Sequence, residues 1–151
     1  PEQEGTNWGW NSPYWRNFGA AWGGMFSTVA DLTRFLKMFL NGGELDGVRV
    51  FSKMAVKAMT TDQTSPMPGI PSSQKFAMRS GLGWRLAPSS CWGFFGDFLL
   101  PGSFGHGGAT GTVFWADADR DMTFVLLTTQ PSIWSESLLR KASNLAIASI
   151  N

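Results

Sequence analysis

The stretch from Phe104 to Thr129 constrains the fold of this chain most, because it alternates short apolar runs with turn residues. Phe104–Thr110 has the pattern of a glycine-rich strand, and Thr112–Asp117 that of a second strand. The polar residues 117–121 are typical of a turn, and the apolar run Met122–Thr129 follows as a third strand. Runs of this length separated by short turns indicate antiparallel neighbours. The stretch therefore predicts an antiparallel meander of three strands.

A helix is predicted after Gly23-Gly24, with Ser27 or Thr28 as its N-cap and Asp31 completing a loose capping box. Asn41-Gly42-Gly43 supplies the left-handed stop. One face carries the apolar stripe of Val29, Leu32, Leu36, Phe39 and Leu40. This face should pack against the sheet.

A second long helix is predicted over residues 134–150, introduced by Pro131-Ser132. Its predicted apolar face consists of Leu138, Ala142, Leu145, Ala146 and Ile150. Helices flanking an antiparallel sheet define the α+β class. We therefore expect an α+β fold in which an antiparallel sheet is flanked by helices.

The remaining segments have weaker patterns. An Asp-Gly turn within residues 44–50 predicts a small hairpin, and Ser52 is expected to cap a short helix over about residues 53–60. Residues 61–80 and 87–103 are predicted as loops, the second with exposed aromatics at Trp92, Phe94, Phe95 and Phe98, and residues 81–86 as a strand. Residues 1–22 have no regular period, and their aromatic side chains are expected to point inward.

Composition excludes several classes of function. The net charge is +1 and there is no basic stripe, which argues against a nucleic-acid partner. No run of eighteen apolar residues exists, so no membrane span is predicted. One cysteine, Cys91, and one histidine, His106, exclude an internal disulfide and Cys- or His-cluster metal sites, and neither a metal nor a cofactor is expected. Cys91 is interpreted as inert.

The string Phe104-Gly105-His106-Gly107-Gly108-Ala109-Thr110-Gly111 is the most informative motif for function. It does not match a dinucleotide fingerprint, because Thr110 occupies the third glycine position, and no lysine follows to make a phosphate-binding loop. Glycine in a strand can mark the close approach of a ligand or of another backbone. A bent strand carrying a surface histidine is the alternative interpretation.

Four motifs occur in an order that resembles one family: GGMFSTVADLTRFLKMFLNGG, LDGVRVFS, GLGW and FGHGGATGT. They resemble the C-terminal part of the β-lactamase-related serine hydrolases, which include class C β-lactamases, D-alanyl-D-alanine carboxypeptidases and related esterases. The resemblance covers about residues 20–150. It implies that residues 1–151 form a single partial domain, the C-terminal portion of a serine hydrolase whose N-terminal catalytic portion is absent. The start at Pro1 agrees with a piece of a longer protein.

The resemblance also implies roles for particular residues. The His106-Gly107-Gly108 triplet fits the third catalytic motif of the family, on an edge strand that faces the nucleophile. These three residues would bind substrate, with His106 contacting its carboxylate or the network of the other motifs, and the backbone N–H of Ala109 would be one oxyanion donor. The substrate would be a small ester, peptide or β-lactam. The compartment stays undetermined, although the family resemblance is compatible with the periplasm or secretion.

The other two family motifs are not matched in this chain. The one Ser-x-x-Lys match, Ser72-Ser73-Gln74-Lys75, lies among prolines and is interpreted as accidental. Tyr14 lies in Tyr14-Trp15-Arg16-Asn17, one residue too long for Tyr-x-Asn, and is interpreted as a packed aromatic. The chain is therefore expected to lack nucleophile and base, and to be inactive alone. A non-catalytic, aromatic-rich binding module for cell-wall or carbohydrate ligands is the alternative function.

The third predicted strand bears on partners. It is apolar on both faces from Phe124 to Leu127, and Met122–Thr129 contains neither lysine nor proline to protect an edge. In the resembled family, N-terminal strands pair beside this strand. The expected partner is therefore the remaining N-terminal part of the same protein, and without it the strand should recruit another edge.

Overall fold

The computed structural model describes residues 6–88, 93–130 and 132–150, and its centre is a four-stranded antiparallel sheet. The strand order is β3 (Arg85–Leu86), β4 (Phe104–Gly108), β5 (Thr112–Asp117) and β6 (Met122–Leu127). The predicted meander is confirmed, with β4 and β6 ending two residues earlier than expected. The strand predicted over residues 81–86 is shorter as well, since only Arg85 and Leu86 pair with β4.

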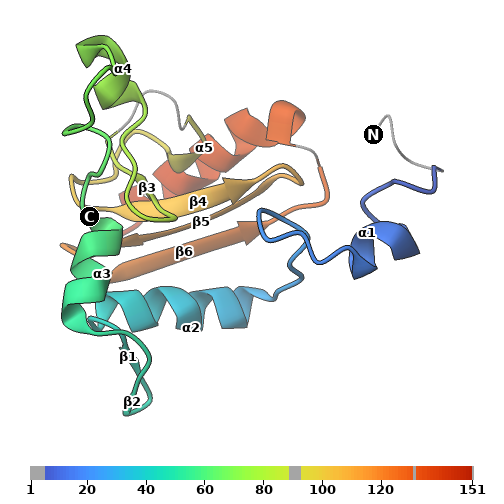
Figure 1. Cartoon of the computed structure of the whole chain (residues 1–151), viewed down its shortest axis with the longest axis horizontal. Coiled ribbons are helices and arrows are strands. Elements are labelled where there is room, and N and C mark those ends of the chain that lie inside the picture. The colour runs from blue at the N-terminus through green and yellow to red at the C-terminus, as the bar shows by residue number, and fades with distance from the viewer. Residues whose placement is uncertain (1–5, 89–92, 131, 151) are drawn as a thin grey trace.

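Helices cover both faces of this sheet (Figure 1), so the predicted α+β class is confirmed. Successive residues of β5 alternate between two cores, as the pleat of a strand requires. Ala116 packs in the core formed with the helix α2 (Val29–Leu40), which includes Leu36 and Phe39. Trp115 packs in the opposite core, formed with the helix α5 (Ser132–Ala148).

The first long helix begins and ends as predicted. The Thr28 hydroxyl caps α2 by accepting the Asp31 N–H at 3.1 Å, and it donates to the Asp31 carboxylate at 2.8 Å. At the other end the Gly43 N–H donates to the Met38 carbonyl, with positive φ at Gly42 and Gly43. Val29, however, the first residue of α2, is 50% exposed. Its predicted place in the apolar face is wrong.

The predicted apolar face of α5 is also wrong. Leu138, Leu145 and Ile150 are more than half exposed, whereas Leu139, Ser143 and Ile147, spaced four apart, are buried. The sheet-facing stripe was hidden in the sequence because its middle residue is polar. Ser143 is accommodated there by the indole of Trp115, whose Nε1–H donates to the Ser143 hydroxyl at 2.7 Å.

The smaller elements agree with the sequence at most positions. β1 (Glu44–Leu45) and β2 (Val48–Arg49) form the predicted hairpin, and the Ser52 hydroxyl caps α3 (Lys53–Thr60) as expected. The segment predicted as a loop over residues 61–80 contains a short helix, α4 (Ser72–Ala77), which sequence reasoning missed. A 3₁₀ turn, η1 (Gly93–Phe95), interrupts the second predicted loop, where Phe95 is buried rather than exposed and Phe98 is 52% exposed. Cys91 and Trp92 lie outside the described residues.

The N-terminal segment differs most from its prediction. It contains a short helix, α1 (Pro13–Asn17), that stands apart from the sheet and its two long helices (Figure 1). Its aromatic rings pack on one another, since Trp8, Tyr14, Phe18 and Trp22 form a chain with centroids 4.6 to 5.8 Å apart. Trp8 is 64% and Trp22 78% exposed. The rings therefore do not point into the core as expected.

Candidate functional site

The four residues with implied site roles lie at the end of β4 and in the turn that follows it. His106, Gly107 and Gly108 are its last three residues, paired with Phe114, Val113 and Thr112 of β5. All three are partly buried. Ala109 is exposed and begins the turn, which closes with a hydrogen bond from the Gly111 N–H to the Gly108 carbonyl. The strand thus stops one residue before the implied oxyanion donor.

The outer edge of β4 is covered over only part of its length. In the described structure, β3 pairs with Phe104 and Gly105 and reaches no further along β4. The His106–Gly108 segment therefore has β5 on one side and no described strand on the other. An uncovered strand edge presents backbone donors and acceptors to which an extended ligand can add.

The side chain of His106 belongs to the α2 face of the sheet. Strand alternation puts it on the same side as Phe104, which packs in the core formed with α2. Its ring Nδ1 lies 2.7 Å from the Gly107 carbonyl oxygen. Because a carbonyl can only accept, this contact requires the proton on Nδ1 and leaves Nε2 as the second polar atom of the ring. His106 is partly exposed.

Packing accounts for the glycines in this string. A Cβ at Gly105 would collide with the Phe114 carbonyl and the Trp115 side chain. A Cβ at Gly107 would lie 2.9 to 3.1 Å from three ring atoms of Phe94. Other parts of the chain occupy the space in which a side chain at either position would lie. At Gly105 this is the close approach of another backbone, and at Gly107 it is the approach of an aromatic ring.

The two matches interpreted as accidental lie on separate elements. Ser72 and Lys75 do project from one helical turn, since α4 begins at Ser72, but the Lys75 ammonium donates to the Ser65 carbonyl at 2.7 Å. Figure 1 shows α4 beyond one end of the sheet, whereas the β4 arrow points toward the other end. Tyr14 lies in α1 and packs against Trp8 and Phe18. The structure does not bring either match to the end of β4.

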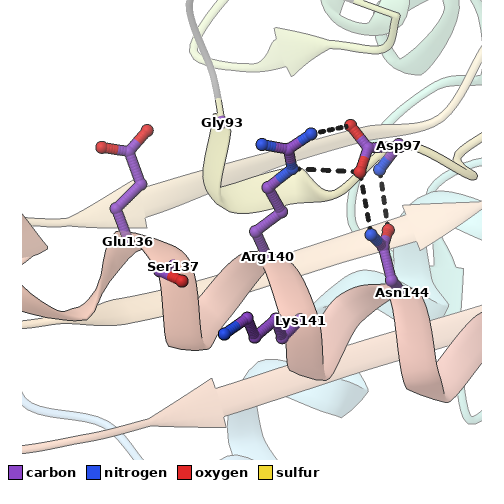
Figure 2. Close-up of a pocket in the computed structure, with 7 residues that line it drawn as sticks. All are labelled: Gly93, Asp97, Glu136, Ser137, Arg140, Lys141 and Asn144. Atoms are coloured by element: carbon purple, nitrogen blue, oxygen red, sulfur yellow. Dashed lines mark hydrogen bonds and ion pairs between the residues drawn. The ribbon is translucent and has the colours of Figure 1, made fainter.

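A charged network joins Asp97, two residues after η1, to α5 (Figure 2). The Arg140 guanidinium donates to both oxygens of the Asp97 carboxylate, at 2.6 and 3.0 Å. Asn144 donates from its side chain to the same carboxylate at 2.9 Å and accepts the Asp97 N–H at 2.7 Å. Together with Gly93 and Glu136, these residues line a shallow pocket. The network fixes the end of η1 against α5.

This network predicts acid sensitivity. The hydrogen bonds from Arg140, then from Asn144, hold the pKa of Asp97 below its ordinary value near 3.8. A carboxylate whose pKa is lower in the folded than in the unfolded state stabilises the fold at pH values above its unfolded-state pKa. This contribution is lost as the pH falls through the folded-state pKa. Asp97→Asn should therefore lower the urea midpoint at pH 7, and the gap to wild type should close below about pH 4. A gap that stays constant down to pH 2 would rule out the carboxylate as its source.

Sequence reasoning missed this network and the ring of Phe94. The signal for the network was present, because Arg140 and Asn144 stand at i and i+4 and so share one helix face. Nothing in the sequence pointed to Asp97, which lies more than forty positions away from either residue. The sequence predicts Phe94 as an exposed aromatic, whereas it is partly buried and packs against Phe95 with centroids 4.9 Å apart.

Within the described residues, no group of three or more His, Cys, Asp or Glu side chains is placed to hold a metal ion. Within the same residues, no helix combines the length and the apolar character needed to cross a bilayer.

Comparison with known proteins gives consistent matches. A family model described as Beta-lactamase matches residues 1–146. A putative D-alanyl-D-alanine carboxypeptidase of Escherichia coli (strain K12) is 34% identical over 109 residues, covering 72% of this chain and 23% of that protein. An uncharacterized protein of Mycobacterium tuberculosis is 32% identical over 141 residues, covering 89% of this chain and 35% of that protein.

A solved structure supports the same grouping. The crystal structure of a beta-lactamase from Mycobacterium bovis superposes with a TM-score of 0.59 at 26% identity, covering 82% of this chain and 44% of the other. The chain therefore spans between about a quarter and under a half of the length of the relatives it matches.

Proposed function

Because the chain belongs to the beta-lactamase family, we propose that it contributes the His106–Gly108 strand and the Ala109 N–H to a serine acyl hydrolase site. In this proposal the substrate is an ester, an amide or a β-lactam, and the reaction passes through an acyl-enzyme. His106 contacts the substrate, the Gly107–Gly108 backbone aligns it, and the Ala109 N–H donates to the oxygen that becomes negative in the transition state.

The observation that carries this proposal is the uncovered edge of β4. The covering strand β3 pairs with β4 only as far as Gly105, and the implied site begins at the next residue of β4. An extended acyl substrate lying along this edge would meet the backbone of His106–Gly108 first and Ala109, which is exposed, at its end. A fixed backbone donor at that point stabilises developing charge without reorganisation.

The serine and its base come, in this proposal, from the rest of a longer protein. Ser72 and Lys75 lie on α4, and the Lys75 ammonium is engaged by a backbone carbonyl. The matched relatives are more than twice the length of the matched region. The edge of β6 is the proposed attachment surface for that remainder, since β6 has no described strand on its outer side and Leu138 and Leu145 of α5 are exposed.

The direct test replaces the matching stretch of the Mycobacterium bovis beta-lactamase with this chain and measures hydrolysis of a chromogenic β-lactam. Ala109→Pro removes the proposed N–H donor, and loss of one oxyanion donor costs about a hundredfold to a thousandfold in kcat. The chimera with Ala109→Pro should show a loss of that size. Ala109→Ser keeps the N–H and should stay within a few-fold of the parent chimera.

Two further measurements keep the test decisive. If the chimera does not fold, amide spectra of the 151-residue chain titrated with N-acetyl-D-alanyl-D-alanine replace it, and the Gly107, Gly108 and Ala109 signals should move. Equal rates for Ala109→Pro and Ala109→Ser, or no movement of these signals, would refute the role of Ala109. The chain alone should not react with a fluorophosphonate probe, and labelling at Ser72 would show that this serine is a nucleophile after all.

The exposed aromatic chain favours a second candidate, a non-catalytic module that binds cell-wall or carbohydrate ligands. Trp8 and Trp22 present most of their ring surface to solvent, and such rings stack on sugar faces. Saturable changes in tryptophan fluorescence on titration with peptidoglycan fragments would support this candidate. Their loss in Trp22→Ala would assign the binding to this segment.

A further inference from the structure

The ring of Phe94 lies directly against the backbone of the proposed site strand. The Cβ of any side chain at Gly107 would be 2.9 Å from Cζ and 3.0 to 3.1 Å from both Cε atoms of that ring. These near-equal distances place the face of the ring, near its Cζ end, over Gly107 on the α5 side of the sheet, opposite the face that carries His106. Nothing larger than hydrogen fits between ring and strand while both keep their positions.

The segment that follows Phe94 is anchored to α5. The neighbouring Phe95 is buried in the core formed with α5, and its carbonyl accepts a hydrogen bond from the buried Ser143 hydroxyl at 2.5 Å. Ser143 in turn accepts the Trp115 indole N–H. On the other side of η1, Asp97 is fixed by Arg140 and Asn144. The backbone that follows Phe94 is therefore anchored to α5 at two points.

We propose that Phe94 is a positioning residue. Its ring sets the position of the Gly107–Gly108 backbone along the sheet normal and thereby the position of the Ala109 N–H. This inference rests on the proposed function for its significance, although the geometry it asserts is independent of it. In the described structure the end of β4 has no covering strand at its outer edge, so its position along the sheet normal depends on what packs against its faces. On the α5 face, the Phe94 ring provides such a contact at Gly107.

The first test is a double-mutant cycle on the free energy of unfolding of the 151-residue chain. Gly107→Ala alone should lower the urea midpoint, because the new Cβ meets the ring. Phe94→Ala removes the ring atoms that the Cβ would meet. The double variant should then be as stable as Phe94→Ala alone, which is a coupling of contacting residues. Additive losses would overturn the inference.

The second test reads the position of the donor without substrate. In amide spectra, Phe94→Leu should shift the Ala109 signal and speed its hydrogen exchange several-fold, while Phe98→Leu, on an exposed ring four positions later, leaves both unchanged. If Phe94→Leu does not fold, Phe94→Met, which keeps most of the volume, takes its place. An unchanged Ala109 signal in a folded variant would show that Phe94 only fills space.

These readouts separate the inference from the proposed function. A shifted Ala109 amide, together with an active Ala109→Pro chimera, would mean that the ring positions the turn but that the turn holds no oxyanion donor. An unmoved amide with an inactive Ala109→Pro chimera would leave the proposed function standing and remove Phe94 from it.

Discussion

Replacing Trp115 with alanine should cost this fold about 3–5 kcal/mol of unfolding free energy, the range for deleting a buried aromatic. The indole is fully buried and stacks on Phe124 with centroids 5.1 Å apart. It also donates to Ser143, which bridges to the Phe95 carbonyl. Domains of this size are stable by only about 5–15 kcal/mol, so the loss is a large fraction of the total.

Urea unfolding of matched variants measures this effect. Trp22→Ala removes the same side chain from a position that is 78% exposed, and it should change the stability by less than about 0.5 kcal/mol. Trp115→Phe keeps most of the ring but removes the N–H, so its loss of unfolding free energy should lie between those of Trp115→Ala and Trp22→Ala. Similar losses for Trp115→Ala and Trp22→Ala would contradict the placement of Trp115 between the sheet and α5.

The 151-residue chain should associate with itself in solution through β6. This strand pairs with β5 on one side and, in the described structure, with no strand on the other. Its residues Met122–Leu127 are uncharged, and most are half-buried because the outer edge is open. Uncharged edges without proline or lysine add further strands through backbone hydrogen bonds. We therefore expect dimers or larger assemblies at micromolar concentration.

Light scattering coupled to size-exclusion chromatography tests this expectation. Leu127→Lys places a charge at an edge position that is already 36% exposed, and it should weaken association at least tenfold. Leu138→Lys, on an exposed position of α5, is the matched control for added charge and should have a smaller effect. A monomer over a wide concentration range, with the amides of residues 124–127 protected from exchange, would mean that this chain already covers the edge.

Local chemistry let the sequence determine the elements that depend on neighbouring residues alone. The two ends of α2 are set by hydrogen bonds within a few residues, at Thr28, Asp31 and Gly43. The Asp46-Gly47 turn adopts the positive φ values that its hairpin requires. The three strands of the meander follow from alternating apolar runs and short turns. The sequence also indicated the family, through the order of four motifs, and the comparisons confirm it.

Burial on the helices required the tertiary structure. The sequence favoured Leu138 and Leu145 as the packed face of α5, since both are apolar, but the sheet contacts the stripe through Ser143 instead. Ser143 is tolerable inside the core only because Trp115 and Phe95, both distant in sequence, satisfy its hydroxyl. The inward packing predicted for the N-terminal aromatics is wrong for a related reason. Within the described structure their rings pack against one another rather than into the core.

In the candidate site, too, the sequence determined some features and the tertiary structure others. The sequence determined which residues carry the motif, His106, Gly107 and Gly108, because identity and order are all that a motif needs. Only the tertiary structure decided that β3 stops short of His106 and that the ring of Phe94 occupies the space beside Gly107. Both facts arise from contacts between segments that are separated along the chain, and such contacts leave no periodic trace in the sequence itself.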